Sequence, residues 1–237
     1  MKKNKDEIKI DESWKFNKST AINFDEHVKN SVPGYENFQK NIAKISRHFI
    51  RKKSVIYDIG CSTGNTILEL IKLNLNIPYK IVGIEKNATM IKIAKLKLNI
   101  KAQKKVHFIK GDFLKTKINE NADVIIACLL TPFLNHKEKE KFFNNINNIL
   151  NKNGALILIE KIKCSDVDFE SIFTDVYYDF KLKKFSEEEI LKKRKSLITA
   201  MDLYSMDELD KEIKKYNFKK YEVFFKDLNF VGLIVVK

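Results

Sequence analysis

The sequence has little cysteine, histidine or proline, and it has no long apolar run. Its three cysteines form no CxxC pair and its four histidines lack ligand spacing, so we expect neither a disulfide framework nor a metal site. The longest dense apolar stretch, residues 124–134, is too short to cross a bilayer and contains Pro132. No apolar segment follows the basic N-terminus, which argues against a secretory signal. We therefore expect a cytoplasmic protein without a membrane partner.

Arginine is scarce, although the formal net charge is +14. Only Arg47, Arg51 and Arg194 are present, and the other basic residues are lysines. These lysines are scattered among asparagines and isoleucines, and all three amino acids have A/T-rich codons, so genome composition can account for the bias. Surfaces that read phosphate usually favour the planar guanidinium of arginine. The charge therefore does not lead us to expect direct nucleic-acid binding.

The hydrophobic content of 44% is sufficient for a folded core, and the pattern along the chain indicates an α/β fold. Strand patterns occur at residues 54–59, 80–84, 106–110, 122–128 and 155–162. Helix patterns occur between them, at residues 63–73, 88–98 and 138–150. Such alternation predicts right-handed βαβ units, a mainly parallel sheet, and ligands bound beyond the carboxyl ends of the strands.

Both ends of the chain depart from this alternation. Residues 1–50 predict a polar leader followed by two amphipathic helices that form a lid, with a Pro-Gly turn between them. Residues 51–237 form the main domain, with a helical insertion at residues 166–203. Ser186 with Glu189, and Ser205 with Glu208, have the spacing of helix capping boxes. The last two strand patterns, at residues 219–226 and 229–236, are too close for a helical crossover. We therefore expect an antiparallel pair at the edge of a seven-stranded sheet.

Glycine is also scarce, and two of the seven glycines lie in one short segment, YDIGCSTGNTILEL. Gly60 and Gly64 flank the turn between the first strand and the first helix, where a sharp bend and a close ligand both favour glycine. Ser62 replaces the second glycine of a dinucleotide-binding G-x-G-x-x-G motif, so no pyrophosphate cradle is expected. The pattern Asp58-x-Gly60-x-x-x-Gly64 instead resembles motif I of class I S-adenosyl-L-methionine (SAM) methyltransferases. A simple strand-to-helix turn is the alternative interpretation.

Two carboxylates follow the next strands. Glu85 comes directly after the second strand, where an acidic side chain can accept both hydroxyls of a ribose. Asp112 follows the third strand, where a carboxylate can accept from an adenine amino group. Each alone is typical of a solvated surface acid, but together, at successive strand ends, they favour a ligand site.

Arg194 lies among apolar residues on the helix that follows Ser186. Its spacing predicts that it points with the apolar face, where a guanidinium is costly to bury without an anion. An internal ion pair or an outward-reaching side chain would also satisfy it. The functional hypothesis is that Arg194 binds a ligand carboxylate bidentately. The apolar residues around it are Ile190, Leu191, Leu197, Ile198 and Met201.

With these features placed, the chain resembles the carboxy-S-adenosyl-L-methionine synthase family from about Phe16 to the C-terminus. A generic methyltransferase would share motif I but not the Pro-Gly-Tyr segment or the helix that carries Arg194. The matching segments are SVPGY at 31–35, DIGCS at 58–62, GALILIEK at 154–161, DFK at 179–181, EEEILKKRKSL at 187–197 and NF at 229–230.

The resemblance implies roles for particular residues. Arg194 would be the catalytic residue, because it would hold the carboxylate carried on the former methyl group of SAM. The other matched positions would bind SAM or carboxy-SAM: Tyr35 contacts the ligand, Gly60, Cys61 and Ser62 line the turn around its methionine part, Glu85 and Lys86 bind the ribose, and Asp112 and Phe113 bind the adenine. Asp58 and Gly64 complete motif I, and Cys128 stands where the family usually has asparagine.

The resemblance also implies a reaction and partners. Prephenate would release carbon dioxide as it becomes phenylpyruvate, and the methyl of SAM, acidified by the sulfonium, would lose a proton and capture the carboxyl group. The product would serve the modification of wobble uridine in tRNA. A homodimer is expected, with the helices around Arg194 as the interface.

Three departures from the family pattern leave other functions open. Cys128 removes an amide, Glu85-Lys86 replaces Asp-Asn, and Lys184-Phe185-Ser186 replaces Gly-Tyr-Ser. Cys128 and the altered segment favour the first alternative, an ordinary SAM-dependent methyltransferase that acts on a small molecule. A SAM-binding module without catalysis is the second alternative.

Overall fold

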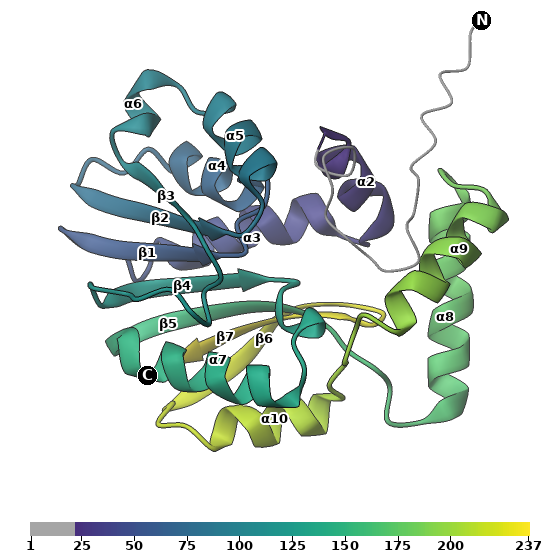
Figure 1. The fold of residues 1–237 in the computed structure, drawn as a ribbon. Coiled ribbons are helices and arrows are strands. Elements are labelled where there is room, and N and C mark those ends of the chain that lie inside the picture. The colour runs from purple at the N-terminus through teal and green to yellow at the C-terminus, as the bar shows by residue number, and fades with distance from the viewer. Residues whose placement is uncertain (1–21) are drawn as a thin grey trace, which may run out of the picture.

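The computed structural model describes residues 22–237 and contains one mixed β-sheet with helices on both faces (Figure 1). The sheet has seven strands in the order β3-β2-β1-β4-β5-β7-β6. Strands β1 to β5 are parallel, and β7 and β6 form the antiparallel edge. The strands are β1 (Ser54–Ile59), β2 (Tyr79–Glu85), β3 (Val106–Lys110), β4 (Ala122–Cys128), β5 (Leu150–Lys161), β6 (Lys220–Asp227) and β7 (Phe230–Val236).

Helices cover the two faces of this sheet because alternate strand residues point to opposite sides. On one face, Phe38 and Ile42 of α3 pack with Ile56 of β1 and with α4. On the other face, Phe142 of α7 packs with Tyr57 and with α10. The helices are α2 (Phe24–Ser31), α3 (Tyr35–Ser46), α4 (Asn65–Lys72), α5 (Ala88–Leu96), α6 (Ile100–Gln103), α7 (His136–Ile149), α8 (Val167–Leu182), α9 (Glu187–Ile198) and α10 (Met206–Lys214), with a 3-10 turn η1 (Thr131–Phe133).

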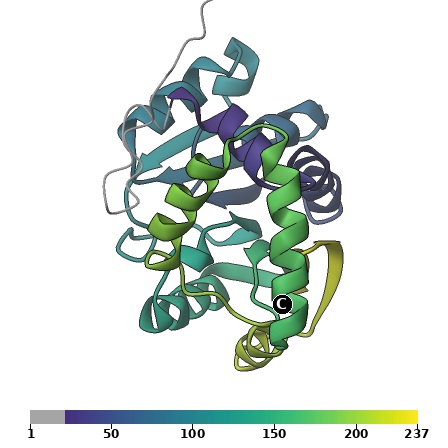
Figure 2. The same ribbon diagram turned by 90° about the vertical axis from the view of Figure 1, so that its right-hand side faces the viewer.

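The carboxyl ends of the parallel strands face the helices of the insertion. Figure 2 looks onto this end of the sheet and shows α8 and α9 in front of it. The strand order reverses between β1 and β4, because the chain continues from β1 to β2 and β3 on one side and from β4 to β5 on the other. In open α/β sheets, ligands bind at such a reversal, outside the carboxyl ends of the strands. The fold therefore predicts a ligand site in the space between β1, β4 and the two helices.

The predicted elements are present, with shifted ends in several cases. Both predicted capping boxes are formed, at Ser186 and Ser205. Strand β5 begins at Leu150 rather than at the predicted residue 155, because Leu150 already pairs with Ala122 before an irregularity in the register. The short helix α6 and the turn η1 were not predicted. The predicted leader lies in residues 1–21, outside the described residues, so the division at residue 50 stays a prediction.

Within residues 22–237, no helix has the length and apolar character needed to span a membrane. Nor does this part of the chain bring three or more His, Cys, Asp or Glu side chains together as a metal site.

Candidate functional site

A cavity of about 710 Å³ lies at the carboxyl ends of the strands. This volume is in the range typical of small-molecule sites. Its lining comes from α2 and α3, the turns after β1 and β2, the end of β4, and α8 and α9. Most of the predicted ligand-binding residues line it: Tyr35, Gly60, Cys61, Ser62, Glu85, Lys86, Asp112, Phe113 and Cys128. Asp58, Gly64 and Arg194 are not among the lining residues.

The turn after β1 has the backbone that its glycines predicted. Gly60 and Gly64 have φ angles of 69° and 79°, in the left-handed region that disfavours residues with a Cβ. A Cβ at Gly64 would also lie 3.0 Å from the Cβ of Ala94 on α5. Ser62 has a φ of 49°, although it is not a glycine. The chain therefore bends sharply here and presents the Gly60–Ser62 backbone to the cavity.

Asp58 lies on β1, two residues before Gly60, and does not line the cavity. Its carboxylate is buried, and its Oδ2 has no hydrogen-bond partner among the described residues. Burial, together with the nearby Glu85, raises the pKa of Asp58 to about 7. A buried, unpaired carboxylate is stabilised by a cationic group placed against it. The site therefore fits a ligand that carries a positive charge, such as the ammonium or sulfonium of SAM.

Glu85 and Asp112 are held in place by backbone amides. The Oε2 of Glu85 accepts from the Ser62 N–H at 3.0 Å, and its Oε1 accepts from the Asn87 N–H at 2.8 Å. The Oδ1 of Asp112 accepts from the Leu114 N–H at 2.9 Å, and its Oδ2 lies 3.2 Å from the Lys86 ammonium. Each carboxylate retains further lone pairs for a ligand. The sequence correctly predicted that these acids meet at successive strand ends.

Helix α2 is fastened to the turn after β1. The Oδ1 of Asp25 accepts from the Thr63 hydroxyl at 2.5 Å and from the Asn65 amide at 3.0 Å, and Asp25 also pairs with Lys97. The Tyr35 hydroxyl accepts from the same Asn65 amide at 3.1 Å. These contacts join the N-terminal helices to α4. Sequence analysis missed Asp25, because nothing in its neighbourhood signals a long-range partner.

Cys128 ends β4 at the cavity wall. Its Sγ accepts from the Gln39 side-chain amide at 3.6 Å, and the Gln39 Oε1 accepts from the Thr66 hydroxyl at 2.8 Å. Burial, reinforced by Asp58, raises the pKa of the Cys128 thiol. A protonated thiol is a poor nucleophile. Cys128 therefore shapes the cavity, and the amide of Gln39, from α3, lies beside it.

The prediction that Arg194 points with the apolar face of α9 is wrong. Arg194 is exposed, and its guanidinium carbon lies 5.7 Å from the centroid of the Tyr178 ring on α8. The spacing misled because the apolar residues of α9 occupy two faces of the helix. Leu191 and Ile198, which flank Arg194 at i−3 and i+4, are themselves 48% and 65% exposed.

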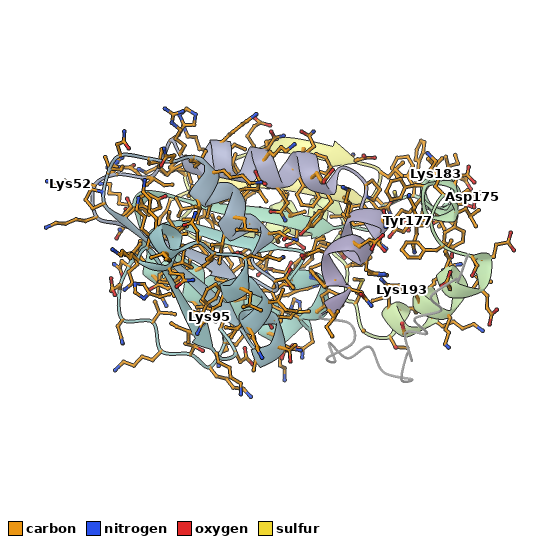
Figure 3. All side chains as sticks on the ribbon, turned by 90° about the horizontal axis from the view of Figure 1, so that it is seen from above. Lys52, Lys95, Asp175, Tyr177, Lys183 and Lys193 are labelled. Carbon is orange, nitrogen blue, oxygen red and sulfur yellow. The ribbon has the colours of Figure 1, made fainter. Side chains whose placement is uncertain are left out.

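The face of α9 that meets the cavity carries a different cation. Helix α9 lines the cavity with Lys193 and Leu197, and Met201 lines it just after the helix ends. Ile190, one turn before Lys193, is buried. Lys161 at the end of β5 and Lys181 on α8 line the same cavity. Figure 3 shows Tyr177 and Lys193 on the side of α8 and α9 that faces the rest of the molecule, whereas Asp175 lies on the outer side of α8.

These lysines are site residues that sequence reasoning missed. All three lie in segments that carry the family resemblance, GALILIEK, DFK and EEEILKKRKSL. Burial lowers the pKa of Lys181 to about 8, with repulsion from Lys161 adding to the effect, and burial lowers the pKa of Lys193 to about 7. Lys193 lies three residues after Ile190 and four residues before Leu197, and this helical spacing could have placed it on the same face as these apolar residues.

Comparison with known proteins gives the family. The model of a family described as a methyltransferase domain matches residues 50–229. The carboxy-S-adenosyl-L-methionine synthase of Staphylococcus epidermidis is 33% identical, over 94% of this chain and 97% of that protein. The enzyme of the same name from Nautilia profundicola is 33% identical, over 96% of each chain.

Solved structures support the fold. An O-methyltransferase family protein from Burkholderia thailandensis superposes with a TM-score of 0.68 at 12% identity, and human N-acetylserotonin methyltransferase in complex with SAM superposes with a TM-score of 0.62 at 13% identity. The match covers 94% and 93% of this chain but only 60% and 55% of theirs, so this chain spans little more than half the length of those proteins. The predicted Rossmann-like methyltransferase fold, with its antiparallel edge, is confirmed. The chain therefore has a methyltransferase domain and belongs to the carboxy-S-adenosyl-L-methionine synthase family of enzymes.

Proposed function

We propose that the protein binds SAM in the cavity and transfers a carboxyl group from prephenate to it, giving carboxy-SAM and phenylpyruvate. The observation that supports this most strongly is the likeness to carboxy-SAM synthases along nearly the whole chain, together with a cavity that is acidic at one end and basic at the other. A SAM-binding module without catalysis would have no use for the basic end.

The acidic end suits the adenosyl compound. Glu85 is placed to accept from the ribose hydroxyls, and Asp112 with Phe113 to bind the adenine. Tyr35 and the backbone of Gly60–Ser62 would surround the methionine part. The buried Asp58, two residues before Gly60, would favour a positive charge at this end of the cavity without contacting the ligand. When bound, the sulfonium makes the neighbouring methyl group acidic enough to lose a proton.

The basic end suits the co-substrate. Prephenate loses carbon dioxide and its ring hydroxyl, as hydroxide, when it becomes phenylpyruvate. The hydroxide takes the proton from the methyl group to give water, and the deprotonated methyl carbon forms a new carbon–carbon bond with the carbon dioxide. Fixed cations near that carbon stabilise the new carboxylate, as preorganised charge does at oxyanion sites. The lysines from β5, α8 and α9 provide such cations inside the cavity.

We also propose the homodimer that the family resemblance implied. Helices α8 and α9 expose several large apolar side chains, and a contiguous apolar patch is typical of an interaction surface. Dimer formation through these helices would cover the exposed apolar residues and surround Arg194. The proposed role of Arg194 in holding the product carboxylate depends on that assembly. The exposed side chains are Val167, Phe169, Ile172, Val176, Leu191 and Ile198.

The supply of carboxy-SAM for tRNA wobble uridine modification belongs to the same proposal. It requires no tRNA contact by this chain, because the product is a diffusible small molecule. Deletion of the gene in its host should remove carboxymethyl-derived groups from wobble uridine, as measured by mass spectrometry of digested tRNA. Unchanged modification would contradict this part.

The direct test is the identity of the small molecule that the protein retains through purification. Mass spectrometry should find an adenosyl compound heavier than SAM by one carbon dioxide. Retention of SAM alone would contradict carboxylation and would favour an ordinary small-molecule methyltransferase. Cys128 is the observation in favour of that second function, since its thiol replaces an amide that the family uses at this position. Prephenate-independent methylation of an extract component would support it.

A further inference from the structure

Three lysines from β5, α8 and α9 line the cavity. Lys161 ends β5, Lys181 is one turn past Tyr177 on α8, and Lys193 belongs to α9. The Nζ of Lys161 lies 5.1 Å from the centroid of the Tyr177 ring, and the Nζ of Lys181 lies 4.7 Å from it. The Tyr177 hydroxyl donates to the Ser31 carbonyl at 2.7 Å, which fixes the ring. Two ammonium groups therefore share one anchored aromatic ring.

The described residues supply little negative charge to Lys161 and Lys181. Within the described part of the chain, neither Lys161 nor Lys181 forms an ion pair with a carboxylate. Glu170 is the acid that acts on Lys161, but its oxygens accept from the Cys164 N–H at 2.7 Å and from the Asn229 amide at 3.0 Å and 3.2 Å. Glu170 therefore serves mainly to hold the chain after β5.

Burial makes this arrangement costly without an anion. Lys181 is only 5% exposed, and burial, together with repulsion from Lys161, opposes its protonation. Buried charges are normally paired, because desolvation of an unpaired ammonium is strongly unfavourable. Cation–π contact with Tyr177 offsets only part of this cost. Lys161 and Lys181 are thus arranged for negative charge that arrives with a ligand.

The two ends of the cavity differ in charge. Asp58, Glu85 and Asp112 lie at the strand ends of β1 to β3, whereas the lysines lie at β5, α8 and α9. A positively charged nucleoside is favoured at the first end and an organic anion at the second. The lining between them is mainly apolar, which strengthens both electrostatic interactions.

We propose that Lys161, Lys181 and Lys193 form the co-substrate subsite and that the cluster selects an organic dianion over a monoanion. The inference rests on the proposed function, since it names the part of the cavity that the carboxyl donor occupies. It also gives product release a physical reason. Prephenate enters with two carboxylates, and phenylpyruvate leaves with one, so the product is held less strongly by the three lysines.

The test uses Lys161→Met and Lys181→Met, with Lys183→Met as the matched control. Lys183 is exposed at the end of the same helix and does not line the cavity. Binding of prephenate and of phenylpyruvate is measured by calorimetry on the full chain with S-adenosylhomocysteine present. Each cavity variant should weaken prephenate about tenfold or more, since a charged hydrogen bond is lost, and should weaken phenylpyruvate less. S-adenosylhomocysteine affinity should stay within about twofold of wild type, and Lys183→Met should match wild type in every measurement.

The outcomes separate this inference from the proposed function. Wild-type turnover of prephenate with an unchanged KM in both cavity variants would overturn the subsite and leave the function intact. Lysine-dependent binding of prephenate without any carboxy-SAM formation would support the subsite and contradict the function. Equal affinity of the wild type for prephenate and phenylpyruvate would overturn the selection of a dianion. Equal weakening of S-adenosylhomocysteine in both variants would also overturn it, because the lysines would then act on the whole fold.

Discussion

Replacing Lys181 with methionine should stabilise the protein near neutral pH. Burial and repulsion from Lys161 lower the pKa of Lys181 from 10.5 to about 8. The difference of about 2.5 pH units corresponds to roughly 3 kcal/mol of folding free energy at a pH below both values. Methionine has an unbranched apolar chain that can occupy the same space without the charge. We therefore expect Lys181→Met to gain up to about 3 kcal/mol at pH 6 to 7.

The sign of the pH dependence makes this prediction specific. Between pH 8 and 10.5 the unfolded chain holds a proton at Lys181 that the folded chain has released, so wild-type stability rises with pH in this window. The advantage of Lys181→Met should therefore shrink as the pH rises from 7 to 10. The cavity lining that includes Lys181 also includes Lys161, Lys193, Tyr177 and His27.

The assay is urea denaturation of wild type, Lys181→Met and Lys183→Met at pH 6, 7, 8, 9 and 10 without added ligand. Lys183→Met should follow wild type within about 0.5 kcal/mol at each pH, because Lys183 is exposed. A loss of stability in Lys181→Met at pH 7 would refute the reasoning. So would a gain of the same size at every pH, since packing alone would then explain it.

Three further predictions concern the turn after β1, its buried acid and the outer helix face. Burial and Glu85 raise the pKa of Asp58 to about 7, so its negative charge, which favours the ligand ammonium nearby, is lost below pH 7. Affinity for S-adenosylhomocysteine should therefore fall about tenfold from pH 8 to pH 6 in calorimetry, and Asp58→Asn should bind weakly with a flat pH profile. Gly64→Ala should cost roughly 1–2 kcal/mol in urea denaturation because of its φ of 79° and the nearby Ala94, and an unchanged midpoint would contradict the strained turn. Ile172→Glu should convert the proposed dimer to a monomer in sedimentation analysis, whereas a wild type that sediments as a monomer would refute the interface.

The fold was predictable because the strand and helix periods follow from burial. Strand β1 was predicted at residues 54–59 from its pattern, and it is buried along its whole length, as suits a strand of a parallel sheet. The short strands β6 and β7 were predicted as an antiparallel pair because a turn of two residues cannot contain a crossover helix. The start of β5 was not predictable, since it depends on pairing between Leu150 and Ala122, which are distant in sequence.

The acidic end of the site was predictable for a related reason. Parallel strands bring their carboxyl ends to one edge, so Glu85 and Asp112 had to lie near the glycine turn. The basic end was not, because it depends on how α8 and α9 pack against the sheet. Helical spacing placed both Lys193 and Arg194 next to apolar residues, and only the tertiary structure shows which of the two faces the cavity.

Carboxyl transfer within this cavity is the central claim, and isotope transfer tests it most directly. The purified protein is incubated with SAM and with prephenate labelled with carbon-13 in the carboxylate that is lost, and the nucleosides are examined by mass spectrometry. The account predicts a labelled adenosyl compound heavier than SAM by one labelled carbon dioxide, formed together with phenylpyruvate. Unlabelled SAM as the only nucleoside, beside intact prephenate, would contradict it.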